Sequence, residues 1–413
     1  MDILRFITAG SVDNGKSTLI GRLLHDSKAI YADQLLAMEQ QSRSNAAGCI
    51  DLALLTDGLR AEREQGITID VAYKYFSTAV RKFIIADTPG HVQYTRNMVT
   101  GASTADLAVI LIDARQGVAE QTKRHTLISS LLGIPNLVVA VNKIDLVSYS
   151  RDIFEQIVAD YQVLIKDFGL KSVSFIPISA LKGDNVVSRS TEMSWYNGDT
   201  LLQVLEQVEV KKSVNLKDAR FPVQYVIRPQ TEELPDYRGY AGKIISGIYR
   251  KGDKVIILPA GTESTISKIE TASSEVDEAF APQSVVLQLS DAVDVSRGDM
   301  IVKKDSVPAM SQELEVMLCW LDNKPLTIGA KYLLQLNSTT TKAIVTGIAY
   351  RINIETLQQE PEPGQANLND IVKASIKTAI PLPHDAYSRL RENGGAILID
   401  ENSCATVAAC MIQ

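Results

Sequence analysis

The segment 10–17 constrains what this 413-residue chain can fold into more than any other part of the sequence. It reads Gly-Ser-Val-Asp-Asn-Gly-Lys-Ser, a full match to the pattern GxxxxGK[ST], and it lies between a short apolar run and a helix-like segment at 17–24. In that context the loop N–H groups surround phosphate oxygens, Lys16 supplies a positive charge, and the Ser17 hydroxyl can bind Mg²⁺. The motif therefore predicts a nucleotide phosphate site made of Gly10, Ser11, Val12, Asp13, Asn14, Gly15, Lys16, Ser17 and Thr18.

Short apolar runs alternate with longer amphipathic segments from residue 3 to about residue 208. Nearly continuous runs rich in β-branched residues are typical of strands buried on both faces of a parallel sheet, whereas 121–132 and 152–168 have helical period. We therefore predict a doubly wound α/β domain with a mostly parallel sheet over residues 1–212. Its predicted strands are 6–9, 83–86, 107–112, 137–141 and 175–178.

The pattern changes after residue 212. Phe221, Val223, Tyr225 and Ile227 alternate with other residues, and short strand-like segments follow at turn-sized intervals, among them 254–258 and 284–289, with Gly and Pro between them. This pattern predicts a compact β-barrel or sandwich over 213–306 and a further all-β domain over 307–413. The segment 239–243 superficially resembles a second phosphate loop, but its spacing is wrong, and we assign it to a strand.

A second motif follows the predicted strand at 137–141. Asn142, Lys143 and Asp145 belong to the tetrapeptide Asn-Lys-Ile-Asp, at a strand end where ligands of open α/β sheets bind. A carboxylate at Asp145 can accept two N–H bonds from guanine, which adenine cannot match, while Asn142 braces the loop. Downstream of a phosphate loop this motif selects GTP over ATP. Backbone N–H groups after the last strand are expected to meet the guanine oxygen, from Ser179, Ala180 and Leu181.

A third motif follows the predicted strand at 83–86. The Asp87 carboxylate is placed to hold a Mg²⁺-bound water, and the Gly90 N–H to face the γ-phosphate, although an ordinary Asp-x-Pro-Gly turn is the alternative interpretation. His91 is expected to orient or polarise the attacking water. The nucleotide-binding residues predicted here are Asp87, Thr88, Pro89, Gly90 and His91.

Thr68 lies between these two motifs, where a nucleotide-sensing loop must supply a hydroxyl to Mg²⁺. The alternative is that it belongs to a β-strand beginning at Ile67. The predicted metal ligands are thus Ser17, Thr68 and Asp87.

Composition excludes several other classes of protein. There are 42 Lys and Arg against 49 Asp and Glu, which gives a formal charge of −7 and a pI of about 5.3, so we expect no nucleic-acid or membrane partner. Four cysteines without metal-ligand spacing fit a reducing compartment. We find no signal-like leader and no apolar stretch of about 18 residues, and we expect a cytoplasmic protein.

Taken together, the chain resembles GTPases of the elongation factor Tu/1A superfamily, in which a G domain precedes two β-barrels. Within it the chain is similar to the large GTPase subunits of bacterial ATP sulfurylases. The resemblance extends over essentially the whole length, and the segments 10–26, 51–73 and 81–98 carry it most specifically.

This resemblance implies a smaller catalytic ATP-sulfurylase subunit as partner, in a heterodimer or higher assembly. The partner makes adenosine 5′-phosphosulfate and pyrophosphate from ATP and sulfate, an uphill reaction of sulfate assimilation that the family couples to GTP hydrolysis on the large subunit. GTP and Mg²⁺ are the implied cofactors. The residues implied to act in hydrolysis are His91, Lys16, Thr68 and Gly90.

Some residues depart from the family pattern. Elongation factor Tu has histidines at the positions of Ser11 and Asn14, many relatives have Glu at the position of Val92, and related ATP sulfurylase subunits commonly have Asp at position 14. No second GxxxxGK[ST] motif occurs, so we expect no fused adenylylsulfate kinase domain in this chain.

Two other functions stay open at this point. One is delivery of aminoacyl-tRNA by a translation elongation factor, although 333–341 lacks the His-Thr dipeptide that elongation factors show there. The other is a GTP-dependent switch whose barrels only bind a partner.

Overall fold

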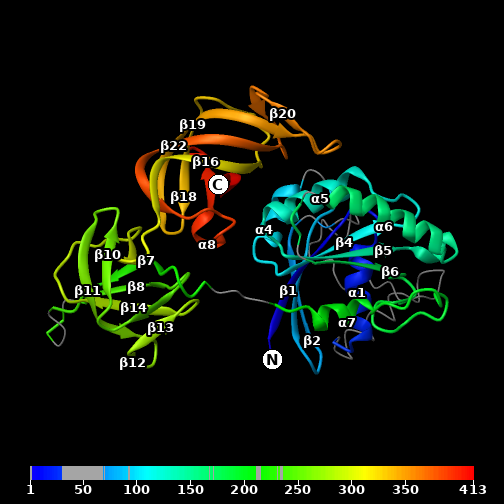
Figure 1. The fold of residues 1–413 in the computed structure, drawn as a ribbon, viewed down its shortest axis with the longest axis horizontal. Helices are drawn as coiled ribbons and strands as arrows, with labels where there is room; N and C mark the ends of the chain where they lie inside the picture. The colour runs from blue at the N-terminus through cyan, green and yellow to red at the C-terminus, as the bar shows by residue number, and fades with distance from the viewer. Residues whose placement is uncertain are drawn as a thin grey trace. The chain divides into compact units, whose positions relative to one another are not determined.

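The computed structural model describes residues 2–29, 68, 70–91, 94–166, 168–170, 172–210, 215–229, 231–232 and 236–413. The chain forms two compact units, one essentially of residues 1–211 and the other of residues 212–413 (Figure 1). No helix among the described residues is long and apolar enough to span a membrane.

The first unit contains a mixed, mostly parallel six-stranded sheet. Its strand order is β2-β3-β1-β4-β5-β6, and only β2 runs antiparallel to its neighbour. The central strands are rich in apolar residues because they are buried on both faces of the sheet, and in β4 all seven side chains are buried. The strands are β1 (Ile3–Ala9), β2 (Ala72–Ser77), β3 (Lys82–Asp87), β4 (Leu107–Asp113), β5 (Asn136–Asn142) and β6 (Ser172–Pro177).

Helices connect these strands. Apolar side chains of α1 and α7 share one buried cluster with β1 and β3, which fixes both helices against the sheet. The parallel registers place Thr8 beside Asp87 and Asp113 beside Asn142, so the loops that follow β1, β3 and β5 meet at one edge. The helices are α1 (Lys16–Asp26), α4 (Thr95–Ala102), α5 (Glu120–Leu131), α6 (Arg151–Ile165), α7 (Leu201–Gln207) and the 3₁₀ helix η3 (Ile144–Val147).

The second unit contains two closed antiparallel β-barrels. In the first barrel the order β10-β15-β7-β8-β14-β11 closes through a β10–β11 pairing, and β12 extends β11. The segment that superficially resembles a phosphate loop is strand β8, as predicted. The strands are β7 (Arg220–Ile227), β8 (Gly239–Lys243), β9 (Ile248–Arg250), β10 (Lys254–Leu258), β11 (Thr262–Glu270), β12 (Glu275–Val276), β13 (Glu278–Phe280), β14 (Ser284–Leu289) and β15 (Met300–Lys303).

The second barrel has the order β18-β23-β24-β16-β22-β19 and closes through a β18–β19 pairing. The fold class predicted from the sequence, an α/β nucleotide-binding domain followed by two β-barrels, is therefore confirmed. The elements are β16 (Ala309–Trp320), β17 (Leu326–Thr327), β18 (Lys331–Leu336), β19 (Thr339–Ile352), β20 (Gln359–Pro361), β21 (Gln365–Ala366), β22 (Ile371–His384), α8 (Arg391–Gly394), β23 (Gly395–Ile399) and β24 (Thr406–Ile412).

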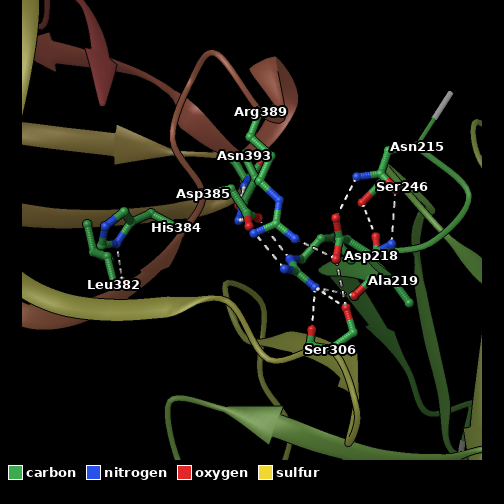
Figure 2. A network of polar contacts seen from close by, with 12 residues as sticks. Asn215, Asp218, Ala219, Ser246, Ser306, Leu382, His384, Asp385, Arg389 and Asn393 are labelled. Carbon is green, nitrogen blue, oxygen red and sulfur yellow. Dashed lines mark hydrogen bonds and ion pairs between the residues drawn. The ribbon is translucent and has the colours of Figure 1, made fainter. Parts of the chain in front are cut away.

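A buried ion pair joins the two barrels. Arg220 on β7 donates from Nε and Nη2 to the Asp385 carboxylate at 2.8 and 3.0 Å, and the two residues are 1% and 5% exposed. Asn393 donates a further hydrogen bond to Asp385 at 2.8 Å, and Arg220 also donates to Ser306 Oγ at 3.2 Å (Figure 2). Burial raises the pKa of Asp385, but the hydrogen bonds from Arg220 and Asn393 outweigh burial, and the net shift is downward. The aspartate is therefore a paired anion at neutral pH.

Candidate nucleotide-binding site

The phosphate loop lies between the end of β1 and the start of α1. Gly15 precedes the helix with φ 87°, a left-handed conformation that favours glycine, and an added Cβ would lie 2.5 Å from the Asn142 side-chain nitrogen. At Gly10 an added Cβ would lie 2.8 Å from the Leu111 carbonyl oxygen. Both glycines of the motif are thus required by close approaches of the loop to β4 and β5.

Lys16 is buried inside this loop, with 7% of its surface exposed. Its Nζ donates to the carbonyl oxygens of Gly10 and Ser11, both at 2.9 Å. Burial lowers the pKa of Lys16 to about 8, although the charges of Asp87 and Asp13 act in the opposite direction. The ammonium is held where it can meet a phosphate anion that would restore its ordinary pKa.

The segment after β3 lies against the phosphate loop. An added Cβ on Gly90 would lie 2.5 Å from Lys16 Nζ and 2.8 Å from the Gly10 carbonyl oxygen, so only a glycine permits this approach. Thr88 Oγ1 donates to the Thr8 carbonyl oxygen at 2.6 Å and holds the segment to β1. The backbone at Gly90 therefore lies beside the charge expected to bind the outer phosphates.

Asn142 links the phosphate loop to the segment after β6. Its Nδ2 donates to the Asn14 carbonyl oxygen at 2.7 Å, and its Oδ1 accepts from the Ala180 N–H at 2.9 Å. Asn14 is itself held by a 2.9 Å bond from its side chain to the Leu111 carbonyl oxygen. The Asn14 side chain thus serves the loop structure here.

The Asp145 segment begins with Lys143 in a left-handed conformation, φ 61°, and Asp145 lies within η3. Lys143 Nζ forms a 3.1 Å ion pair with buried Asp113, which also pairs with Arg115 at 2.6 Å. Burial raises the pKa of Asp113, but the hydrogen bonds from Arg115 and Lys143 outweigh it and lower the pKa to about 2. The anion at the end of β4 therefore anchors Lys143.

The 179–181 segment is buried at Ser179 and Ala180, whereas Leu181 is 62% exposed. The Ser179 N–H donates to the Asp184 carbonyl oxygen at 3.2 Å, and the Ala180 N–H donates to Asn142. Within the described part of the chain, the Leu181 N–H is the member of this trio without an acceptor. Of the three predicted guanine contacts, the Leu181 amide is thus the one already free for a ligand.

A metal ion would need oxygen ligands here, because Mg²⁺ prefers carboxylate, hydroxyl, water and phosphate oxygens. Asp87 is 1% exposed and accepts a 3.3 Å bond from the Thr8 hydroxyl, and Ser17 lies in the first turn of α1. These residues supply the oxygen donors that Mg²⁺ takes. Among the described residues there is no cluster of three or more His, Cys, Asp or Glu side chains suited to a metal.

Thr68 is half-buried and lies outside every strand, because β2 begins at Ala72. Thr68 is thus not assigned to a strand, and Ile67, where the alternative strand would begin, lies outside the described residues. His91 is half-buried beside Tyr94, with ring centroids 6.2 Å apart. Gly66, Ile67, Ile69 and Val92, together with most of the segment 51–73, lie outside the described residues.

Sequence reasoning missed several residues that shape the site. Arg22 on α1 donates from Nε to the Ala180 carbonyl oxygen at 3.1 Å and from Nη2 to the Leu181 carbonyl oxygen, and so holds the segment after β6. Asp113 and Asp184 act in the same way on neighbouring segments. None of these residues belongs to the three short motifs, and the folded chain, rather than the sequence spacing, brings them to the site.

A phosphate loop with a buried lysine, an Asp-x-Pro-Gly segment beside it and an Asn-Lys-x-Asp loop linked to it define a P-loop GTPase. Comparison with known proteins agrees. Residues 1–211 match the elongation factor Tu GTP binding domain family, and residues 313–413 match the GTP-eEF1A C-terminal domain-like family.

Relatives that match this chain over nearly its whole length narrow the class of protein further. The chain is 51% identical to sulfate adenylyltransferase subunit 1 of Bacteroides fragilis over 100% of this chain and 86% of that protein. It is 50% identical to the subunit of the same name from Shewanella oneidensis, over 99% and 85%. It is 49% identical to the bifunctional enzyme CysN/CysC of Mycobacterium tuberculosis, over 99% of this chain and 67% of that enzyme. The chain belongs to the sulfate adenylyltransferase subunit 1 family, within the elongation factor Tu type of GTP-binding proteins.

Proposed function

We propose that this chain is the GTPase subunit of an ATP sulfurylase and couples GTP hydrolysis to the synthesis of adenosine 5′-phosphosulfate and pyrophosphate from ATP and sulfate. The observation that carries the proposal is identity of about half of all residues, over the whole chain, to proteins named sulfate adenylyltransferase subunit 1. The partner is a smaller subunit that contains the adenylylation site.

The phosphate end of the nucleotide is bound by the loop from Gly10 to Thr18 in this proposal. Lys16 meets the β- and γ-phosphates, and its buried ammonium at 2.9 Å from two loop carbonyl oxygens is already directed by the loop. The Gly90 N–H faces the γ-phosphate, which agrees with the close approach of Gly90 to Lys16. Phosphoryl transfer depends mainly on such positioning and charge stabilisation.

A bound Mg²⁺ would supply positive charge against the charge that develops on the phosphates. Ser17 and Thr68 would provide hydroxyl oxygens for it, and Asp87 would hold it through a water. His91 orients the attacking water from the position that follows Gly90.

The base is bound by Asn142, Lys143 and Asp145 together with the 179–181 segment. Asp145 accepts from the two guanine N–H groups, and the Leu181 amide, free in the described structure, donates to the guanine oxygen. Adenine presents an acceptor and no 2-amino group on the edge that faces Asp145, so the site prefers GTP.

The test is GTP hydrolysis by the purified chain, with and without a co-expressed small ATP-sulfurylase subunit, and with and without ATP plus sulfate. Stimulation that needs both the partner and both substrates supports coupling. A partner that neither binds nor stimulates refutes the sulfate assignment. A GTP-dependent, salt-sensitive complex with aminoacyl-tRNA at micromolar strength or better would instead favour tRNA delivery.

Three further expectations belong to this proposal. The chain has the domain limits 1–212, 213–306 and 307–413, it acts in the cytoplasm, and it assembles as a heterodimer or a larger complex with the small subunit. Limited proteolysis and the mass of the co-purified complex test the first and the last.

A further inference from the structure

The chain reverses direction sharply where the base is expected to bind. Lys143, Ser148 and Tyr149 have φ values of 61°, 54° and 55°, and together they flank η3, which contains Asp145. A left-handed conformation costs a non-glycine residue about 1 kcal/mol or more and persists where surrounding contacts hold it. The position of the Asp145 carboxylate therefore depends on the contacts that hold this reversal.

Tyr149 makes those contacts through its backbone at one end and through its phenol at the other. The Trp195 indole N–H donates to the Tyr149 carbonyl oxygen at 3.0 Å, and the Tyr149 N–H donates to the Ile144 carbonyl oxygen at 2.9 Å. At the other end the phenol donates to Asp184 Oδ2 at 3.2 Å and accepts from Lys182 Nζ at 3.3 Å. Burial raises the pKa of Tyr149, so the phenol keeps its proton and donates at neutral pH.

Asp184 belongs to the other half of the base site. Its carbonyl oxygen accepts the Ser179 N–H at 3.2 Å, and its Oδ1 accepts from the Ser190 hydroxyl at 2.7 Å. The bond from Tyr149 to Asp184 therefore links the segment of Asp145 with the segment 179–181. It is a further link between these segments, separate from the one made by Asn142.

Trp195 has a simpler role. Its ring centroid lies 5.5 Å from that of Phe154 and 6.3 Å from that of Tyr196. The ring therefore packs in a local aromatic cluster, while its N–H holds the Tyr149 carbonyl oxygen. Apolar packing alone does not need the Tyr149 hydroxyl. That hydroxyl is bonded to a carboxylate on another segment, which indicates a geometric role.

We propose that Tyr149 is a positioning residue for guanine recognition. Through Asp184 and Trp195 it fixes the distance between the Asp145 carboxylate and the 179–181 amides, so that both polar edges of the base are met together. Tyr149 itself need not touch the nucleotide. This inference rests on the guanine site proposed above.

The test compares GDP with IDP on the full chain, because inosine lacks the 2-amino group that Asp145 is expected to bind. Tyr149→Phe removes only the hydroxyl. We expect GDP to bind about 3- to 10-fold more weakly, as for the loss of one hydrogen bond, and IDP, which can make only one of the two bonds to Asp145, to weaken by a smaller factor. The preference for GDP over IDP therefore falls.

Tyr161→Phe is the matched control. It removes another phenol of the same unit, which is fully buried and bonded to the Thr126 hydroxyl at 2.7 Å, away from the base loop. The control should leave the GDP-to-IDP ratio unchanged. A second variant, Asp184→Asn, should lower the ratio as well, and the double variant Tyr149→Phe/Asp184→Asn should lower it by less than the product of the two effects.

An unchanged ratio in Tyr149→Phe overturns the inference, and so does an equal fall in the Tyr161→Phe control. If the wild-type chain shows no preference for GDP over IDP and ADP, the guanine site itself is wrong. That result is distinguishable from failure of Tyr149 alone, because it appears before any variant is made.

Discussion

The buried ion pair between Arg220 and Asp385 gives the strongest stability prediction. Asp385→Ala leaves the Arg220 guanidinium, 1% exposed, without its two carboxylate bonds of 2.8 and 3.0 Å. Removing one member of a buried pair typically costs 3–5 kcal/mol. Arg220 keeps hydrogen bonds to the Ala219 and Ser306 carbonyl oxygens, so we expect a loss at the lower end, about 3 kcal/mol.

The assay is urea unfolding followed by tryptophan fluorescence. The chain has two tryptophans, and Trp320 is buried in the core of the second barrel, so a Trp195→Phe background makes Trp320 the single reporter for the barrels. With a urea dependence of about 3 kcal/mol per molar, the midpoint for Asp385→Ala should fall by about 1 M.

Glu360→Ala is the control for this experiment. It removes an ion pair with Arg351 in the same barrel, whose two side chains are 37% and 33% exposed, and such pairs contribute about 0–1 kcal/mol. Its midpoint should move by less than about 0.3 M. If Asp385→Ala moves the midpoint no more than Glu360→Ala does, the argument that the barrels are held by this buried pair is refuted.

Three further predictions concern the nucleotide site. Burial lowers the pKa of Lys16 to about 8 in the free protein, so triphosphate affinity should fall as the pH rises through 8. Binding should take up to one proton from solution at pH 9 and none at pH 7, which calorimetry in buffers of different ionisation enthalpy measures. A triphosphate affinity that does not depend on pH would contradict this prediction. Asp145→Asn should shift preference from guanine toward xanthine nucleotides, and unchanged GTP selectivity in competition binding would show that the base assignment is misplaced. His91→Ala should leave GTP affinity within about twofold and slow hydrolysis at least about 100-fold, as for the loss of a general base, and a wild-type rate in single-turnover assays would remove His91 from the mechanism.

The sequence predicted the buried parts of the fold well. Strand β4 is a continuous apolar run up to Asp113, with every side chain buried, and the predicted strands at 254–258 and 284–289 coincide with β10 and β14. In the α/β domain and in the barrel alike, the order of apolar residues in the sequence of these strands matches the order of their buried side chains. Where burial determines the secondary structure, the pattern of apolar residues was sufficient to predict the strand.

Edge and terminal elements were harder to predict. Strand β2 lies at the edge of its sheet, where Tyr73 and Tyr75 are 45% and 68% exposed and Lys74 lies between them, so no apolar run marks it. Helix α6 was predicted to run to residue 168 but ends at Ile165. The apolar period continues past the last helical turn, and Gly169 with φ 63° follows shortly afterwards.

The site could be predicted from the sequence where the residues that act together form a short, continuous motif. The motifs at Lys16, Asp87 and Asp145 each follow a strand, and parallel strands bring their carboxyl ends to one edge. Arg22 and Tyr149 could not be found in this way, because their partners lie 158 and 35 residues away and only the folded chain brings them together.

Asn142 has a thermodynamic consequence, since one short amide is bonded to both the loop that meets phosphates and the loop that meets the base. Ordering either loop restricts the amide and thereby lowers the entropy that the other loop still has to lose. Guanosine and inorganic pyrophosphate should therefore bind synergistically when both are present, each tightening the other by the same factor. A whole nucleotide gains that coupling free energy in a single binding event, whereas a nucleoside or a free phosphate alone does not.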